Sequence, residues 1–175
     1  FILFKDKGFF WDAKLVSIEA HKIYYSGLKI LFTSELFKIS VTGYHFPFIP
    51  ILTAILWKIF GYHLWVLHFF MLICTIVLLI SLHNLLKKFF TEDIIPLIAL
   101  LILVEPTVLT QFAIASPDFI LLSLFVVTLN GIIDDKKWFV MIGMIAMCLT
   151  SMRGIFTGVI LSVVFLIFKL ISTQD

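Results

Sequence analysis

Charged residues are scarce in this sequence of 175 residues, in which Lys, Arg, Asp and Glu together make up only 14%. Hydrophobic residues make up 62%, and the mean hydropathy is +1.15. These values exclude an ordinary soluble domain. The net charge is only +2, and no basic patch accompanies it, so nucleic acid is not an expected partner. The composition predicts a protein that is mostly embedded in a membrane.

Cysteines are few, and the motifs of soluble nucleotide-dependent enzymes are absent. Cys74 and Cys148 both fall inside apolar runs, where they are expected to be small buried hydrophobic residues. Neither a disulfide nor a CxxC metal site is indicated. The sequence has no GxGxxG fingerprint, no Walker loop and no HExxH motif, so soluble nucleotide-dependent chemistry is not supported.

Long apolar segments are abundant, and they predict an all-α fold: a polytopic transmembrane bundle with interfacial juxtamembrane helices in the first outer loop. About 20 consecutive apolar residues cross a bilayer as an α-helix. Residues 1–4 are expected to end a preceding membrane helix, which makes the chain a fragment of a larger membrane protein. The outer loop then covers 9–62. Membrane spans are expected at 64–86, 94–114, 118–133, 138–152 and 154–171.

The outer loop is expected to hold short helices at the membrane surface. Asp12 is a plausible N-cap, and Ser26-Gly27 is a stop signal for the first helix. Glu19 and His21 of this helix are expected to line the outer surface. Residues 45–62 carry prolines at their start, which favours a short interfacial helix over a span. Within the span 94–114, Glu105 is costly in lipid and is expected to face other helices.

The lysines predict the orientation of the bundle. Cytoplasmic loops of membrane proteins are enriched in Lys and Arg. Lys87-Lys88, Lys136-Lys137 and Lys169 share one side if 45–62 does not cross the bilayer. The polar residues Asp12, Tyr44, His45, Asp118 and Arg153 then gather on the opposite, outer side. A carboxylate, a histidine and an arginine collected at one membrane boundary indicate a binding or catalytic site.

Two carboxylates are candidates for chemistry, and each has a plain structural alternative. Asp12 follows the aromatic residues 9–11, and partial desolvation there would raise its pKa and make it a better base. Its alternative role is that of an N-cap. Asp118 could serve an acceptor or a metal together with Asp12, or it could cap the helix that follows it.

The other candidates are residues that bind phosphate. Arg153 suits bidentate phosphate recognition, although a snorkelling membrane anchor explains it equally well. His45 could bind a metal, orient a phosphate or shuttle protons, and Tyr44 precedes it. The alternative for His45 is an interfacial residue without a role.

In order and spacing, these motifs resemble the GT-C superfamily of polytopic glycosyltransferases, closest to its protein O-mannosyltransferase-like and lipid A aminoarabinose transferase-like groups. In those groups an acid opens an outer-loop helix, a Gly ends it, and a His-Pro-Pro or Lys-Pro-Pro motif precedes a short helix ending in Phe-Gly. The matching residues are Asp12, Gly27, His45-Phe46-Pro47 and Phe60-Gly61. Later motifs of the family match Lys87-Lys88-Phe89, Pro106, Asp118, Trp138 and Arg153-Gly154. The chain departs from the family at Ala13 and Phe46.

The resemblance implies an inverting glycosyltransferase that uses a polyprenyl-phosphate sugar donor. Its acceptor would be a lipid, a glycan or a protein, and its site would face outward from the plasma or inner membrane, or into the ER lumen. Asp12 would be the general base, and Asp118 would position the acceptor or a cation. His45, with Tyr44, would line the donor-phosphate pocket, and Arg153 would stabilise the phosphate leaving group.

Three further possibilities stay open from the sequence. A divalent cation could be held by Asp12, Asp118 and His45. A transporter or lipid flippase would make use of Glu105 and the adjacent Pro106. A membrane scaffold without catalytic activity would need none of these residues.

Overall fold

The computed structural model of the chain describes residues 12–27, 46 and 48–172. Over these residues the regular structure is entirely helical, which confirms the all-α prediction. The helices are α1 (Asp12–Ser26), α3 (Phe48–Phe60), α4 (Leu64–Leu86), α5 (Ile95–Val104), α6 (Pro106–Ala113), α7 (Pro117–Ile133), α8 (Lys137–Thr150) and α9 (Met152–Ser172).

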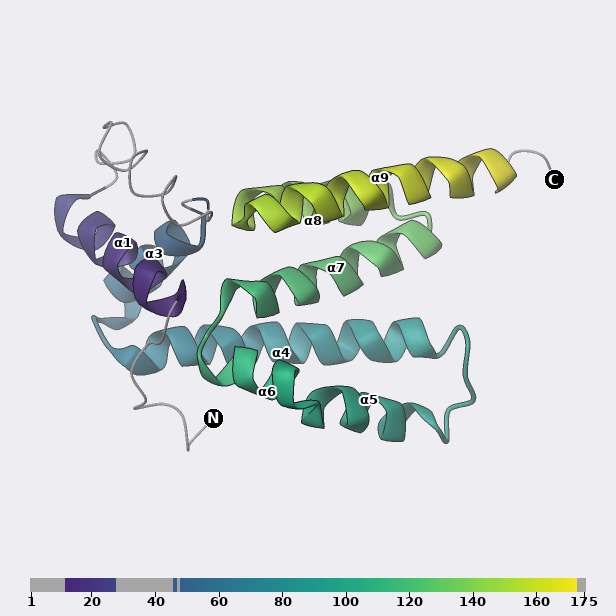
Figure 1. Ribbon diagram of the computed structural model, residues 1–175, viewed down its shortest axis with the longest axis horizontal. Helices are drawn as coiled ribbons and strands as arrows, with labels where there is room; N and C mark the ends of the chain where they lie inside the picture. Colours follow the sequence, from purple (N-terminus) through teal and green to yellow (C-terminus); the bar gives the residue numbers. More distant parts are fainter. Residues whose placement is uncertain (1–11, 28–45, 47, 173–175) are drawn as a thin grey trace.

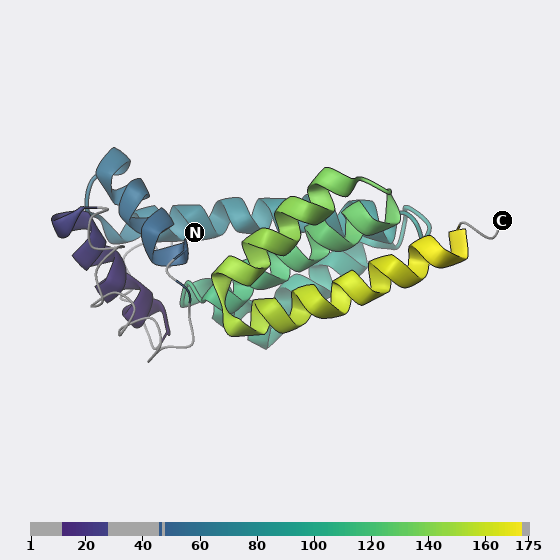
Figure 2. The same cartoon turned by 90° about the horizontal axis from the view of Figure 1, so that it is seen from above.

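The long helices lie side by side in a bundle, with α1 and α3 at one end (Figures 1 and 2). Helix α7 packs against both α4 and α8, and α9 lies along α8. Helices α4 and α7 both start at the end where α1 and α3 lie, and α8 returns to it (Figure 1). The α6–α7 and α8–α9 turns are therefore at one end of the bundle, while the lysine-containing turns after α4 and α7 are at the other.

Helix α1 forms because its apolar positions recur with helical spacing, and it ends at a glycine. Val16, Ala20 and Ile23 are buried on one face, as expected for positions that recur every three to four residues. Gly27 has φ +73°, and its N–H donates to the carbonyl of Ile23 at 2.9 Å. The predicted stop is confirmed, since glycine adopts this left-handed conformation without a steric penalty.

Helix α3 is short and packs against α1. Its 13 residues extend over about 20 Å, less than the hydrocarbon thickness of a bilayer. Its buried face includes Thr53, Ala54 and Trp57, and the Trp57 indole donates to the carbonyl of His63 at 3.2 Å. Helix α3 therefore has the length expected of an interfacial helix.

Among the described residues, α4 is the one helix that is long and apolar enough by itself to cross a membrane. Its bounds, Leu64–Leu86, coincide with the predicted segment. The segment predicted over 94–114 is instead broken into α5 and α6, which are bent by 62°. This pair would count as a second span if it were treated as one helix.

The break lies at Glu105, and here the expectation that Glu105 faces other helices is wrong. Glu105 is exposed and is the N-cap of α6. Its carboxylate accepts hydrogen bonds from the Val108 N–H and the Thr107 hydroxyl, both at 2.9 Å. Because Pro106 has no N–H to continue α5, the chain starts a new helix, and Glu105 satisfies its first free donors.

Candidate functional site

Arg153 and Asp118 meet at the end of the bundle where α1 and α3 lie. Arg153 is the second residue of α9, and Asp118 is in the first turn of α7. Arg153 Nη1 donates to Asp118 Oδ2 at 2.5 Å. The side chain of Arg153 is 74% exposed, while that of Asp118 is 28% exposed. The ion pair therefore fixes one edge of the guanidinium and leaves most of it accessible.

Asp118 is available for this pair because another residue caps α7. The N-cap is Ser116, whose Oγ accepts from the Asp118 N–H at 3.3 Å. Pro117 occupies the first turn, where its missing N–H costs nothing. The alternative in which Asp118 is the helix cap is therefore wrong.

A glycine sets the position of Arg153 on the other side of the pair. A Cβ atom added to Gly154 would lie 1.9 Å from the carbonyl oxygen of Met147. Only a residue without a side chain allows α9 to start so close to α8. The Gly154 N–H also donates to Ser151 Oγ at 3.2 Å, which closes the first turn of α9. Gly154 thus permits a close approach of α9 to α8, and the preceding residue, Arg153, reaches Asp118 of α7.

A small cavity of about 200 Å³ opens beside Asp118, between α6 and α7. Thr107, Gln111 and Asp118 give it a polar side, and Val108, Phe119 and Leu122 give it an apolar side. Gln111 Oε1 is buried and finds no hydrogen-bond donor within the described part of the chain. A buried acceptor without a partner is costly to the stability of the fold.

Phe46, the residue after the predicted histidine in the sequence, contacts the same end of the bundle. The Phe46 N–H donates to the carbonyl of Thr150 at 3.4 Å. Thr150 ends α8, only a few residues before Arg153. Tyr44 and His45 themselves lie outside the described residues, so their side chains are not placed here.

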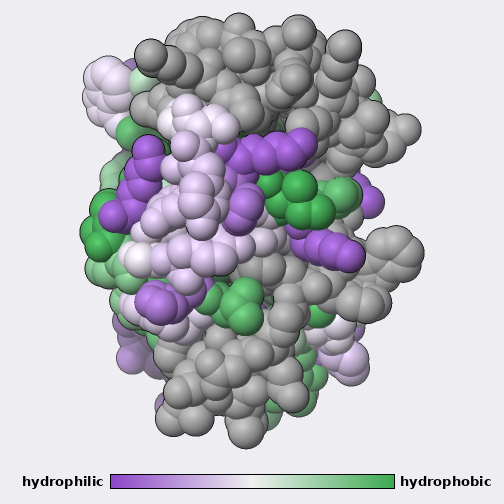
Figure 3. Space-filling view, turned by 90° about the vertical axis from the view of Figure 1, so that its left-hand side faces the viewer, coloured by the Kyte–Doolittle hydropathy of each residue, from purple (hydrophilic) through white to green (hydrophobic). Residues whose placement is uncertain are grey.

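Asp12 is the first residue of α1, as the sequence predicts, although its side chain lies outside the described part of the molecule. Helix α1 belongs to the same end of the bundle as Asp118 and Arg153 (Figure 1). Figure 3 looks onto this end, where hydrophilic side chains are spread over the surface. Helix α1 contributes exposed Lys14, His21 and Lys22. Exposed apolar residues of α1, among them Leu15 and Ile18, lie between these polar side chains, so this end of the molecule presents a mixed surface.

The expectation that Glu19 lies with His21 on the outer surface is wrong. Glu19 is buried, with 4% exposure, on the same face of α1 as Val16, Ala20 and Ile23. His21, in contrast, is exposed and packs its ring against Tyr25, with 4.6 Å between the ring centroids. The helical spacing of positions 16, 19, 20 and 23 is the sequence signal that places Glu19 on the apolar face of α1.

The burial of Glu19 changes its acid–base behaviour. Burial raises the pKa of its carboxyl group to about 7, and the positive charge of Lys22 opposes this rise. Its Oε2 atom has no hydrogen-bond partner among the described residues. A carboxyl group with a pKa near neutrality is suited to exchanging protons at physiological pH.

The described residues offer no support for a cation at Asp118. They contain no group of three or more His, Cys, Asp and Glu side chains that could hold a metal ion. The Asp118 carboxylate already pairs with the Arg153 guanidinium, and a divalent cation there would be repelled by that positive charge. Asp12 and His45, the other members of the expected metal site, have side chains outside the described residues.

Comparison of the chain with models of protein families, with curated proteins and with solved structures found no match. The resemblance to glycosyltransferases therefore rests on the sequence motifs alone. The geometry of the site shows an exposed arginine that pairs with a carboxylate.

Proposed function

We propose that the chain belongs to a polytopic membrane glycosyltransferase, which transfers a sugar from a polyprenyl-phosphate donor to a hydroxyl or phosphate acceptor at the outer or lumenal membrane face. The observation that carries the proposal is the Asp118–Arg153 ion pair at one end of an apolar helical bundle, opposite to the turns that carry the lysines. The motif resemblance described above supplies the type of donor.

The distribution of apolar side chains supports an embedded bundle. The most apolar stretch of α4 has a mean hydropathy of 2.5, yet only 33% of it is buried, whereas the core helix of a soluble protein is mostly buried. Large apolar side chains also point outward from the other helices of the bundle, including Leu101 of α5, Ile142 of α8 and Phe156 of α9. Such a surface is suited to lipid rather than water. We infer that α4 to α9 together cross the membrane.

The geometry of Arg153 supports a role in binding phosphate. Guanidinium presents several N–H donors in one plane, and Asp118 occupies only part of them. The remaining donors can face the phosphate of a lipid-linked sugar whose tail stays in the bilayer. Because negative charge grows on this phosphate as the bond to the sugar breaks, an arginine held in advance at that position stabilises the transition state. His45 and Tyr44 would complete this pocket, next to the segment that Phe46 anchors.

Asp12 is the proposed general base. An oxygen of the acceptor attacks the anomeric carbon of the sugar, the bond from that carbon to the phosphate oxygen breaks with inversion, and Asp12 takes the acceptor proton. A base placed in this way contributes about 10²–10⁴-fold to the rate. Asp118 orients Arg153 in this scheme, and the cavity beside it, with Gln111, can receive a hydroxyl group of the donor or acceptor. No step is assigned to a divalent cation, because its charge would conflict with Arg153.

The decisive experiment measures sugar release from radiolabelled polyprenyl-phosphate donors by membranes that contain the full-length protein. The Asp12→Asn variant keeps the size of the side chain and should abolish release while the protein remains inserted and folded. Undiminished turnover in Asp12→Asn would reject the base assignment. An absence of release by the folded wild-type protein, tested with lipid, glycan and peptide acceptors, would reject the glycosyltransferase itself.

A transporter or lipid flippase is the second candidate, and the break at Glu105 favours it. Broken helices with exposed backbone ends commonly form substrate sites in transporters. Here α5 and α6 are bent by 62° at Glu105 and Pro106. A Glu105→Gln variant separates the two proposals, because it should impair substrate movement across the membrane in a transporter but leave sugar release unchanged in the proposed enzyme.

A further inference from the structure

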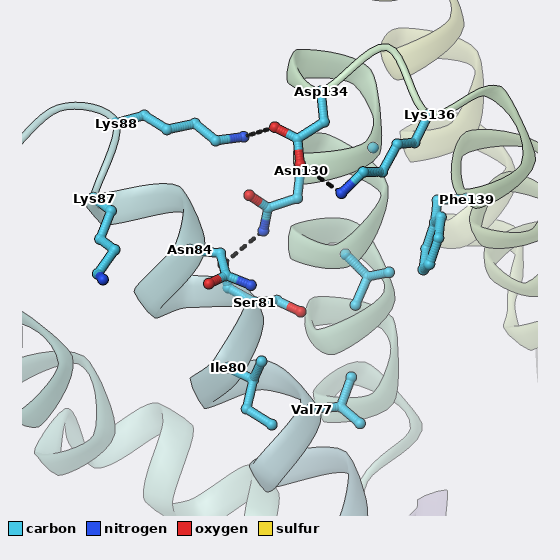
Figure 4. A pocket seen from close by; sticks show the side chains of 12 residues that line it. Val77, Ile80, Ser81, Asn84, Lys87, Lys88, Asn130, Asp134, Lys136 and Phe139 are labelled. Atoms are coloured by element: carbon cyan, nitrogen blue, oxygen red, sulfur yellow. Dashed lines mark hydrogen bonds and ion pairs between the residues drawn. The ribbon is translucent and has the colours of Figure 1, made fainter.

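A second cavity lies at the opposite end of the bundle, between α4 and α7 and beside the start of α8 (Figure 4). Its volume of about 650 Å³ falls within the range of known ligand sites, roughly 300–1,000 Å³. The proposed sugar-transfer chemistry makes no use of it. Its lining contains both apolar residues and lysines, and their order along the helices indicates the kind of ligand that fits.

The lining changes from apolar to cationic along α4. Val77 and Ile80 lie toward the middle of the bundle, Asn84 follows, and Lys87 and Lys88 lie at the helix end (Figure 4). Val127 of α7 and Phe139 of α8 add to the apolar part. A molecule with one apolar and one anionic end fits this gradient.

Polar contacts hold the two walls of the cavity in place. The Asn130 amide of α7 donates to the carbonyl of Ser81 on α4 at 2.6 Å and to the carbonyl of Val126 at 3.2 Å. At the rim, Lys88 pairs with Asp134, which also accepts from Lys136 Nζ at 3.2 Å. The cavity is therefore bounded by fixed helices and its charges have defined positions.

The rim carries more positive than negative charge. The lining contains three lysines, Lys87, Lys88 and Lys136, and one carboxylate, that of Asp134. Asp134 is shared by two lysines and can neutralise only one of them. Lys87 pairs with Glu92 at 2.9 Å outside the lining, but the two side chains are 44% and 78% exposed. Exposed pairs of this kind contribute little, so Lys87 can change partner at small cost.

We propose that this cavity binds the headgroup of an anionic phospholipid from the membrane leaflet on the lysine side. The phosphodiester lies among the three lysines and supplies the negative charge that Asp134 does not. The start of the acyl chains follows Val77 and Ile80, which are exposed on the lipid-facing side of α4. The inference rests on the membrane-embedded bundle of the proposed function and is independent of sugar transfer.

The test is native mass spectrometry of the purified full chain in neutral detergent, titrated with phosphatidylglycerol or with phosphatidylcholine. Each lysine near an anionic lipid contributes about fivefold to binding, so the Lys88→Gln/Lys136→Gln double variant should lose about 25-fold in phosphatidylglycerol affinity. Binding of the zwitterionic lipid should not change. Lys137→Gln is the matched control, because this exposed neighbour lies outside the cavity lining.

Asp134→Asn gives a prediction of the opposite sign. It retains both lysines and removes the competing carboxylate, so phosphatidylglycerol should bind more tightly. Millimolar inorganic phosphate should not displace the lipid, and displacement would assign the site to free phosphate instead. Weaker binding in Asp134→Asn, an unchanged affinity in the double variant, or an equal loss in Lys137→Gln would each overturn the lipid site. Recovery of the folded protein from the soluble fraction without detergent would reject the membrane-embedded bundle, and with it the lipid site. Failure of sugar release alone would reject the proposed enzyme activity but not the lipid site.

Discussion

Replacing Glu19 by glutamine should remove a pH dependence from the packing of α1 onto its neighbours. Glu19 is only 4% exposed, and its Oε2 atom has no hydrogen-bond partner in the part of the chain that the structure describes. Burial raises the pKa of this carboxyl group to about 7, against an ordinary value of 4.5. Ionisation is therefore easier when α1 is detached and Glu19 is in water than when α1 is packed.

The size of the effect follows from these two pKa values. They differ by 7 − 4.5 = 2.5, and each pKa unit corresponds to about 1.4 kcal/mol. Once the pH is high enough to ionise Glu19 in both states, the packed state of α1 should therefore be about 3 kcal/mol less stable, relative to the detached state, than it is at low pH. Because the pKa is raised in the folded state, the stabilising contribution is complete below pH 4.5, declines as the pH rises toward 7 and is absent above that. Glutamine cannot ionise, so the variant should show no such decline.

Hydrogen–deuterium exchange measures this local stability directly. After correction for the intrinsic exchange rate, protection of the α1 amides should fall by about 10²-fold between pH 5 and pH 8, while protection of the α4 amides provides an internal reference. Glu19→Gln should keep α1 protected across this range. Lys22→Gln should extend the decline to higher pH, because the positive charge that lowers the pKa of Glu19 in the packed state is gone.

Two results would refute this reasoning. The first is a protection of α1 that does not change with pH in the wild-type protein, which would mean that Glu19 finds a partner or reaches water. The second is the same pH slope in Glu19→Gln, which would assign the effect to another group.

Three further predictions concern the end of the bundle that holds Asp118 and Arg153. Arg153→Lys keeps the charge but loses the planar donors, so kcat for sugar release should fall by about 10²-fold or more with little change in KM; an equal rise in KM would instead indicate ground-state binding. Asp118→Asn removes the charge that orients Arg153 at 2.5 Å and should cost less, about tenfold, in the same assay. Gly154→Ala should destabilise the bundle by about 1–3 kcal/mol, because its Cβ would meet the Met147 carbonyl oxygen at 1.9 Å. Thermal unfolding in detergent measures this loss, and Gly158→Ala is the milder comparison, since its Cβ would lie 3.2 Å from Cys148 Sγ.

The helical secondary structure and several helix ends could be predicted from the sequence because their causes are local. Helix α1 ends at Ser26 because Gly27 adopts a positive φ. Helix α4 occupies Leu64–Leu86 because this predominantly apolar segment is preceded by Gly61 and His63 and followed by Lys87 and Lys88. The separation of the lysines from Asp118 and Arg153 also follows from the sequence, since it requires only the number and order of the helices.

Other features depended on contacts between distant segments, which a pattern of apolar residues does not specify. Only packing shows that Arg153 reaches Asp118 across 35 positions and that Asn130 bridges to Ser81 across 49. The same holds for Glu19: its position on the apolar face of α1 is visible in the sequence, but its burial requires the neighbouring elements to cover that face. Periodicity determines which side of a helix is apolar, whereas the packing of whole helices decides what lies against it and hence which charges are paired, exposed or buried.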